Sequence, residues 1–389
     1  MRGETTVFST YLDGLAYARK CDLPTFEAVP INFRVTNDGT IDFKMTAATS
    51  GFSLGIRTFL RQLLLEIRFM KRFRPDIVVS DSRASSLLAA RMMRIPVILM
   101  LNQFRVEIIR KPSHRQLSPP DRLFFLIANL GWLFVRTAIQ LVWGRAQVIL
   151  IPDLPAPYTI SQGNLAIPRR YNSKVKLVGP IVETESSSIH YSTQGLRRKL
   201  GLDIKKPVIY AAVSGPRVER KILTQILLKA LSPAARKNTV ILSKGDPEGS
   251  TLPQKSKDML IYDWIPKQDD FIKASDVVVS RAGHGIIMKS IMYGKPMILV
   301  PIPDHTEQYA NARRAEVLGI AKTIDQSKLN RALNSAISDL LLNQKYSKEV
   351  KRIRKSASSM QAVKVTCDLI EDLASREIPR LQESQPGSD

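Results

Sequence analysis

Cysteine is scarce in this sequence, whose 389 residues include only Cys21 and Cys367. So few cysteines exclude a disulfide-bonded scaffold and a cysteine-rich zinc module. The composition is also neither that of a disordered chain nor that of a collagen, because hydrophobic residues make up 44% and charged residues 24% of the total. These are globular proportions, and the length is sufficient for two domains with a core each.

Acidic residues are few relative to basic ones. Asp and Glu number 35 against 58 Lys and Arg, and the formal net charge is +23. This excess predicts an anionic partner, which is a phosphate group, a nucleic acid or an acidic lipid surface. We expect no nucleic acid, because the sequence contains no RNP, zinc-finger or basic-zipper pattern.

Short apolar runs alternate with helical patterns along most of the chain. The predicted strands are 6–10, 25–31, 76–80, 95–101, 147–151, 174–178, 207–213, 239–243, 259–264, 276–280 and 296–301. The predicted helices are 11–20, 55–74, 85–93, 218–231, 271–274, 306–318 and one or two within 347–373. Strands that alternate with helices predict an α/β fold with parallel sheets.

A domain boundary is predicted near residue 182, where Gly179-Pro180 is followed by a short polar segment, 183–188. The strand–helix alternation restarts after it. We therefore expect an amino-terminal domain over 1–182, a second domain over 183–345, carboxyl-terminal helices over 346–376 and a disordered tail over 377–389.

The stretch 123–143 is unusually apolar and contains one charged residue, Arg136. Trp132, Trp143 and basic flanking residues favour a helix that lies in a membrane surface. A buried core helix is the main alternative. A membrane span is the third interpretation, and Arg136 argues against it because a span needs about 20 apolar residues.

The strongest local signal is a small-residue loop between a predicted strand and a predicted helix. It contains Arg281, Gly283, His284 and Gly285. Main-chain N–H groups at the start of a helix are unpaired, and the helix dipole is positive there. Together with the glycines they form a candidate site for a phosphate or diphosphate. An ordinary tight loop is the alternative.

A second polar cluster follows the next predicted strand. It consists of Asp304, His305, Glu307 and Gln308, with Thr306 as the expected helix N-cap. Adjacent polar loops at one sheet edge are where α/β proteins bind ligands. His305 alone is more often a structural hydrogen-bonding residue.

Three segments carry a resemblance to a known family: SRAGHG, YGKPMILVPIP and DHTEQYANARRAEVLG. They resemble the carboxyl half of GT-B glycosyltransferases of the MurG type, family 28, and most of all its archaeal MurG-like relatives. The two-subunit eukaryotic dolichol-linked chitobiose synthase is similar. The resemblance is clear from 207 to 325. It is looser in the amino half, through PDIVVSDSRASSLLAARMMRIPVILMLNQ and PAPYTIS.

The resemblance implies two Rossmann-like domains that face each other across a cleft, with a UDP-sugar bound mainly by the second. It implies a main-chain contact from Ile265 to uracil. The residues implied at the diphosphate are Ser214, Gly215, Gly283, His284 and Gly285. Those implied at the donor sugar and ribose are Asp304, His305, Glu307 and Gln308.

The implied reaction transfers N-acetylglucosamine from its UDP donor to a polyprenyl-diphosphate-linked acceptor, with inversion at the anomeric carbon. The implied charge stabilisation comes from helix dipoles and His284. Neither a metal nor a cofactor is implied, and no pair of carboxylates with metal-ligand spacing follows a predicted strand.

Two departures from the family pattern stand out. Lys289 occupies a position where the family carries an acidic residue that binds the ribose hydroxyls, so this lysine has either a ribose or a phosphate as its expected ligand. The family's first strand and glycine-rich loop are also missing. Three explanations are open: the start codon is misassigned, another chain supplies this unit, or the protein is not catalytic. The missing loop carries the family's candidate base. Candidates to replace it are Asp13, Asp81 and, from the second cluster, His305.

The basic charge fits a lipid-linked acceptor. We expect 55–74 and 123–143 to meet an anionic membrane surface, which places the protein peripherally at the cytoplasmic face of the membrane. Solvated basic faces of ordinary helices are the alternative. A non-catalytic donor-binding subunit, a UDP-sugar epimerase of the same fold and a nucleic-acid binder remain as other functions.

Overall fold

The computed structural model describes residues 5–30, 52–105, 119–182, 191–256 and 258–375. The chain forms two compact units. The first comprises Met1–Thr49, Pro157–Gly163 and Val182–Ser359, and the second comprises Ser50–Ala156, Asn164–Ile181 and Met360–Asp389. The predicted polar linker over 183–188 and the predicted tail over 377–389 lie outside the described residues.

This division differs from the domains expected from the sequence. The boundary near 182 is one of several points at which the chain passes between units. Met1–Thr49 groups with the first unit, whereas the sequence suggested a common domain with the rest of 1–182. The predicted carboxyl-terminal helices are also divided, because α14 (Gln344–Ser358) belongs to the first unit and α15 (Ala362–Ser375) to the second.

The first unit contains a seven-stranded sheet in the order β13-β12-β11-β7-β8-β10-β9, parallel except at β9. The strands are β7 (Val208–Ala212), β8 (Thr239–Ser243), β9 (Gln254–Ser256), β10 (Met259–Tyr262), β11 (Val277–Ser280), β12 (Met297–Leu299) and β13 (Ala321–Thr323). Every residue of β7 and β11 is buried, as expected for parallel strands covered on both faces.

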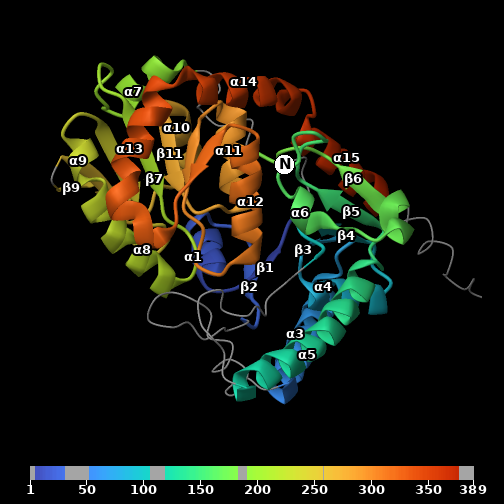
Figure 1. Cartoon of the computed structure of the whole chain (residues 1–389). Helices are drawn as coiled ribbons and strands as arrows, with labels where there is room; N and C mark the ends of the chain where they lie inside the picture. Colours follow the sequence, from blue (N-terminus) through green and yellow to red (C-terminus); the bar gives the residue numbers. More distant parts are fainter. Residues whose placement is uncertain (1–4, 31–51, 106–118, 183–190, 257, 376–389) are drawn as a thin grey trace, which may run out of the picture. The chain divides into compact units, whose positions relative to one another are not determined.

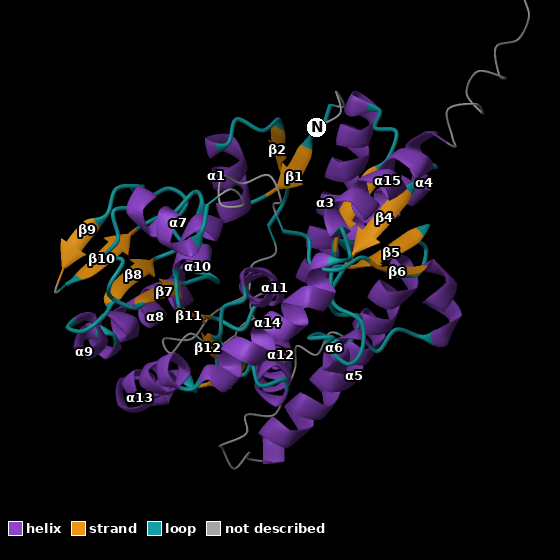
Figure 2. Ribbon diagram, turned by 90° about the horizontal axis from the view of Figure 1, so that it is seen from above, coloured by secondary structure: helices purple, strands orange, loops and turns teal. Residues whose placement is uncertain are grey.

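Helices cover both faces of this sheet (Figures 1 and 2). The helices α8 (Arg217–Ala230), α9 (Ser232–Ala235) and α13 (Leu329–Leu342) share one core with Ile209, Ala211 and Val279. Tyr210 points to the other face, where its ring lies 6.1 Å from that of Phe271 in α10 (Gln268–Ala274). The remaining helices are α7 (Thr193–Lys199), α11 (His284–Tyr293) and α12 (Thr306–Val317).

The amino-terminal segment of the first unit consists of β1 (Phe8–Thr10), α1 (Asp13–Lys20) and β2 (Thr25–Glu27), with the two strands paired in parallel. An ion pair of 2.6 Å joins Asp13 to Arg220 on α8. The Lys20 ammonium donates to the carbonyl of Gly249 at 3.2 Å. These contacts connect α1 to the loops at the carboxyl ends of the large sheet.

The second unit contains a four-stranded parallel sheet of β3 (Val78–Asp81), β4 (Val97–Met100), β5 (Val148–Ile151) and β6 (Val175–Leu177), in that order. One face is covered by α3 (Phe52–Phe73), α4 (Ala84–Met92) and α5 (Pro119–Trp143). The other face meets α15, whose Leu369, Ile370 and Leu373 pack on Ile98 and Leu150.

The apolar stretch 123–143 lies within α5 and is only partly a core helix. The last turn of α5 belongs to the core of the second unit, because Trp143 is buried and its indole N–H donates to the Ser82 carbonyl at 3.2 Å. Farther back along the helix, Leu126, Leu130 and Phe134 are exposed. Among the described residues, no helix combines the length and the apolar character needed to cross a bilayer.

Candidate functional site

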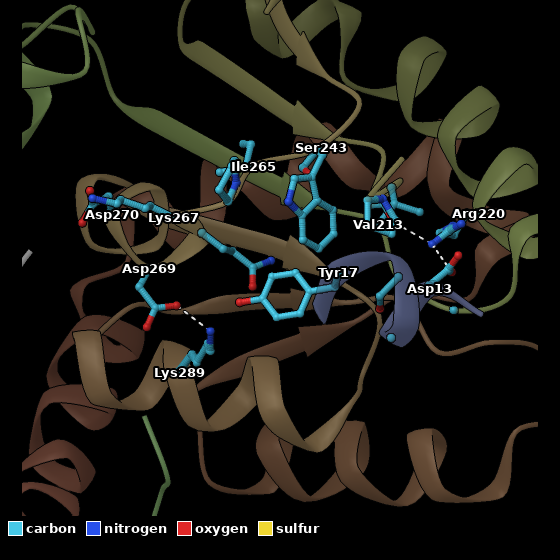
Figure 3. A pocket seen from close by; sticks show the side chains of 18 residues that line it. Asp13, Tyr17, Val213, Arg220, Ser243, Ile265, Lys267, Asp269, Asp270 and Lys289 are labelled. Atoms are coloured by element: carbon cyan, nitrogen blue, oxygen red, sulfur yellow. Dashed lines mark hydrogen bonds and ion pairs between the residues drawn. The ribbon is translucent and has the colours of Figure 1, made fainter. Parts of the chain in front are cut away.

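The strands of the large sheet end in register at one edge. Ser280 pairs with Ala212 and Leu299, and Ala212 pairs with Ser243. The loops that follow these strands therefore leave the sheet side by side. A pocket of about 690 Å³ opens at this edge, between loops of the first unit and its helices α1, α10 and α11 (Figure 3).

Two glycines shape one wall of the pocket. Gly215 follows β7 and has φ +112°, and Gly245 follows β8 with φ +71°. A Cβ atom on Gly245 would overlap the Val213 carbonyl oxygen, so this position requires glycine for both conformation and space. The predicted site residues Ser214 and Gly215 line the pocket here.

The opposite wall begins after β10 with Trp264 and Ile265. The ring of Trp264 lies 5.7 Å from that of Tyr17 on α1, and both residues line the pocket. Ile265 is 5% exposed, so its side chain belongs to the core although the residue lines the pocket. The main-chain contact to uracil that the family resemblance implies stays a prediction.

A carboxylate and an ammonium group line the pocket where α10 meets α11 (Figure 3). Lys289 Nζ lies 2.6 Å from Asp269 Oδ1, and the Tyr293 hydroxyl donates to Asp269 Oδ2 at 3.1 Å. Lys289 was a predicted site residue. Asp269 was not predicted, because nothing in the sequence indicated that α10 brings its side chain against α11.

The glycine-rich loop adopts the predicted strand–loop–helix arrangement. Gly283 is the N-cap of α11, and the Asn311 side chain donates to the Ala282 carbonyl at 3.2 Å. A Cβ on Gly283 or Gly285 would meet no atom within 4 Å, and neither glycine has a positive φ. Packing therefore does not require these glycines. His284, at the first helical position, is 6% exposed.

Arg281 is placed differently from the other residues of its loop. Its side chain is 1% exposed and donates to the carbonyl oxygens of Val300 and Pro301 at 3.3 and 3.2 Å. Burial lowers the pKa of Arg281 to about 10. The guanidinium therefore holds the ends of β11 and β12 together. No residue of the loop 281–285 is among those that line the pocket, to which α11 contributes Lys289.

Glu219 on α8 interacts electrostatically with Arg281. It is 3% exposed, and burial raises its pKa to about 7 although the charge of Arg281 opposes this shift. Neither Glu219 Oε2 nor Arg281 Nε has a hydrogen-bond partner within the described part of the chain. Gly215 lies directly beside this carboxyl group, because a Cβ there would be 3.3 Å from Oε2.

The cluster 304–308 follows β12, the neighbour of β11, but it does not line the pocket. The expected N-cap Thr306 is wrong: His305 is the N-cap of α12, and its Nδ1 accepts from the Gln308 N–H at 3.4 Å. The imidazole reaches this amide because His305 has extended backbone. Gln308 Oε1 accepts from Ile302 N–H at 3.0 Å, while Asp304 is exposed with φ +60°.

The three candidate bases have different surroundings. Asp13 pairs with Arg220 at 2.6 Å and lies 3.5 Å from Arg217. Burial lowers the pKa of His305, which keeps the imidazole neutral while Nδ1 is occupied. Asp81, at the end of β3 in the second unit, has a pKa raised by partial desolvation. A carboxylate whose pKa is raised is a stronger base than an ordinary one.

A metal centre has no counterpart in the part of the chain that the structure describes. No group of three or more His, Cys, Asp or Glu side chains there is placed to hold a metal ion. The charged side chains that line the pocket are those of Asp13, Arg220, Lys267, Asp269, Asp270 and Lys289.

Residues 219–365 match the glycosyltransferase family 28 C-terminal domain. An uncharacterised glycosyltransferase of Methanosarcina mazei is 28% identical over 312 residues, which cover 80% of this chain and 76% of the relative. UDP-N-acetylglucosamine–N-acetylmuramyl-(pentapeptide) pyrophosphoryl-undecaprenol N-acetylglucosamine transferase of Geobacillus thermodenitrificans is 30% identical over 194 residues, covering 48% and 52% of the two chains.

Solved structures show the same architecture. The crystal structure of the calicheamicin glycosyltransferase CalG4 has a TM-score of 0.62 at 14% identity, with 97% of this chain and 93% of that chain covered. This similarity confirms the predicted α/β fold of the GT-B type. The chain is therefore a glycosyltransferase with a GT-B fold, and its carboxyl-terminal domain is of the family 28 type.

Proposed function

We propose that the protein transfers N-acetylglucosamine from UDP-N-acetylglucosamine to a polyprenyl-diphosphate-linked acceptor. The observation that carries this proposal is the edge of the large sheet, where Ser214, Gly215, Ile265 and Lys289 line one pocket and the glycine loop follows β11, the neighbour of β7. The relative from Geobacillus thermodenitrificans, which bears the name of such a transferase, supports this donor and this class of acceptor.

In this proposal, three features of the first unit bind the donor. The backbone of Ile265 faces the base, and the amides of Gly283, His284 and Gly285 hold the diphosphate together with Ser214 and Gly215. Asp304 and Glu307, after the neighbouring strand, face the sugar. Helix N-termini bind phosphate oxygens well, so the proposal requires neither a metal ion nor a cofactor.

In the reaction, an acceptor hydroxyl attacks the anomeric carbon, and the bond from that carbon to the diphosphate oxygen breaks. The configuration at the anomeric carbon inverts, and UDP leaves with the bonding electron pair. The α11 amides and His284 stabilise the charge that develops on UDP. The hydroxyl proton passes to a base, and Asp81, whose carboxyl pKa is raised by burial, is the candidate that we test.

The acceptor proposal draws on the second unit. On α5, five large apolar side chains are 58–70% exposed: Leu123, Leu126, Ile127, Leu130 and Phe134. On α3, exposed cationic side chains are Arg57, Arg61, Arg68, Lys71 and Arg72. Apolar and basic helix surfaces suit a peripheral protein on an anionic membrane, at the cytoplasmic face where nucleotide donors are found.

The test measures UDP release and lipid-linked product with the full chain, UDP-N-acetylglucosamine and a short polyprenyl-diphosphate monosaccharide in detergent micelles. We expect both products in equal amounts. Asp81→Asn should abolish transfer and leave UDP binding unchanged. Binding of UDP without turnover would instead favour a donor-binding subunit, and UDP-sugar interconversion without acceptor would favour an epimerase.

The donor site is tested separately with Gly285→Val. The space beside Gly285 is empty, so the variant should fold while its side chain blocks the diphosphate. We expect UDP affinity to fall by about 100-fold, the equivalent of two charge-assisted hydrogen bonds. Gly131→Val on α5, also without a neighbour within 4 Å, is the matched control. Unchanged UDP binding by Gly285→Val would contradict the proposed donor site.

A further inference from the structure

Asp269 has surroundings that a purely structural ion pair does not need. It is 4% exposed, yet it lines the pocket. We propose that Asp269 accepts hydrogen bonds from the two ribose hydroxyls of the donor nucleotide, with Lys289 and Tyr293 as its positioning residues. This inference rests on the proposed function, because it assigns the part of the UDP donor that this carboxylate recognises.

The hydrogen bonds of Asp269 leave acceptor capacity unused. Within the described residues its side chain accepts one bond from Lys289 on Oδ1 and one from Tyr293 on Oδ2. Each oxygen of a carboxylate can accept two. One further acceptor position therefore remains on each of the two oxygens of the same carboxylate. Two adjacent hydroxyl donors, a vicinal diol, match this arrangement.

The two supporting donors also fix the charge state and the rotamer. A buried carboxylate is costly unless it is paired and hydrogen-bonded. Lys289 supplies the opposite charge at 2.6 Å, and Tyr293, one helical turn farther along α11, supplies a neutral donor at 3.1 Å. The carboxylate is thus held in place before a ligand arrives, which lowers the cost of ordering it on binding.

The position of Asp269 corresponds to ribose rather than to base or phosphate. Ile265, which the proposed function places at the base, lies four residues earlier on the same loop and helix. Lys289 lies five residues after His284 at the start of α11, or about 7 Å along the helix axis. Ribose is the part of the nucleotide that lies between the base and the diphosphate.

The same structure explains how the chain can carry a lysine at position 289. A lysine has three donors and no acceptor, so it cannot accept hydrogen bonds from a diol. Here the acceptor comes from α10, and Lys289 holds it in place. The carboxylate and the ammonium are a unit, and replacing either partner alone should disturb ribose recognition.

A sugar donor also carries vicinal hydroxyls, so the test uses UDP without a sugar. Binding of UDP and of 2′-deoxy-UDP to the full chain is measured by calorimetry. We expect the wild-type chain to bind UDP about ten- to hundredfold more tightly, the range for a hydrogen bond to a charged acceptor. Asp269→Asn should weaken UDP binding by a similar factor and leave 2′-deoxy-UDP nearly unchanged.

Asp263→Asn is the matched control. Asp263 forms an ion pair of similar length with Lys244, at 2.8 Å in the same unit, and neither residue lines the pocket. This variant should keep the wild-type preference for UDP. If Asp269→Asn does not fold, the wild-type comparison alone still decides, together with Tyr293→Phe, which should reduce the preference.

Two results separate this inference from the proposed function. Equal affinity of the wild-type chain for UDP and 2′-deoxy-UDP would overturn the role of Asp269 and leave the UDP site intact. A preference that persists in Asp269→Asn would do the same. Absence of any UDP binding would overturn the proposed function and the inference with it.

Discussion

Glycines at the strand ends of the first unit serve two different purposes. Gly245 has a positive φ and touches the neighbouring loop, so the fold requires it. Gly283 and Gly285 have ordinary backbone conformations and open space beside them. The sequence showed glycines in these loops but could not separate the two kinds, because the distinction depends on which atoms approach from other strands.

Gly245→Ala should therefore be costly. The substitution places a Cβ in the left-handed region and against the Val213 carbonyl oxygen, and we expect a loss of about 3 kcal/mol in the free energy of unfolding. Gly201 also has a positive φ, but no atom lies within 4 Å of a Cβ there, so Gly201→Ala should cost about 1 kcal/mol. Urea unfolding of both variants measures the difference, and equal losses would contradict the steric argument.

Glu219 should make stability depend on pH. Its pKa is about 7 in the folded chain and near 4.5 when unperturbed, so folding favours the protonated form. The favourable contribution is fully present below about pH 4.5 and is lost as the pH rises through 7. Glu219→Gln cannot ionise and should lack this loss.

The measurement is urea unfolding of wild type and Glu219→Gln at pH 5 and pH 8. Between these values we expect the wild type to lose about 2 kcal/mol more than the variant, since each pKa unit corresponds to about 1.4 kcal/mol. The comparison removes the effect of all other titrating groups. Parallel pH profiles would show that the raised pKa of Glu219 does not contribute.

Among the secondary-structure elements, strands with continuous apolar sequences could be predicted from the sequence, whereas short polar strands could not. The buried strands β7 and β11 follow directly from their continuous apolar sequences. β9 and β13 have three residues each, and β9 is an exposed edge strand with the sequence QKS. Their pairing depends on neighbouring strands rather than on their own sequence, so no local pattern predicted them.

The candidate site was predictable to a similar extent. Loops after predicted strands were expected to meet at one edge, and the structure places Ser214, Gly215, Ile265 and Lys289 around one pocket there. The contribution of Tyr17 was not expected, because no local pattern shows that α1 lies against the loop after β10. Contacts between segments far apart in sequence account for most of what was missed.

The exposed face of α5 leads to a prediction about membranes. Leu130 and Phe134 lie one turn apart and are 60% and 70% exposed. Burial of two such side chains contributes about 3 kcal/mol or more, so Leu130→Ser with Phe134→Ser should lower binding to anionic phospholipid vesicles at least tenfold. Co-sedimentation measures this binding.

Leu342 provides the control for that experiment. It lies at the end of α13 in the first unit and is 82% exposed. Leu342→Ser should leave vesicle binding unchanged, because no other large apolar side chains on its helix are exposed with it. Equal vesicle binding by the α5 variant and the wild type would remove α5 from the proposed membrane surface.

At the scale of the molecule, α15 belongs to the second unit although it follows the whole first unit in sequence. Ending the chain at 359 removes the contacts of Leu369, Ile370 and Leu373 with Ile98 and Leu150. We expect the second unit to lose about 3–5 kcal/mol of stability, while UDP affinity at the first unit is unchanged.

Tryptophan fluorescence during urea unfolding reports this outcome. Trp143 lies in the core of the second unit, and Trp264 lines the pocket of the first. A chain that ends at residue 375 keeps α15, and the unfolding transitions of both units should be the same as in the wild type. A chain ending at 359 that unfolds like the wild type would show that α15 contributes little to the second unit.

The path of the chain has a consequence for how the molecule is made. Each unit is assembled from three separate segments, and the backbone changes unit five times, at 49/50, 156/157, 163/164, 181/182 and 359/360. No single protease cut can release either unit as an intact fragment. During synthesis, the strands of the four-stranded sheet are made before those of the seven-stranded sheet, but its covering helix α15 is made only after the whole first unit, so the sheet that is made first is covered last.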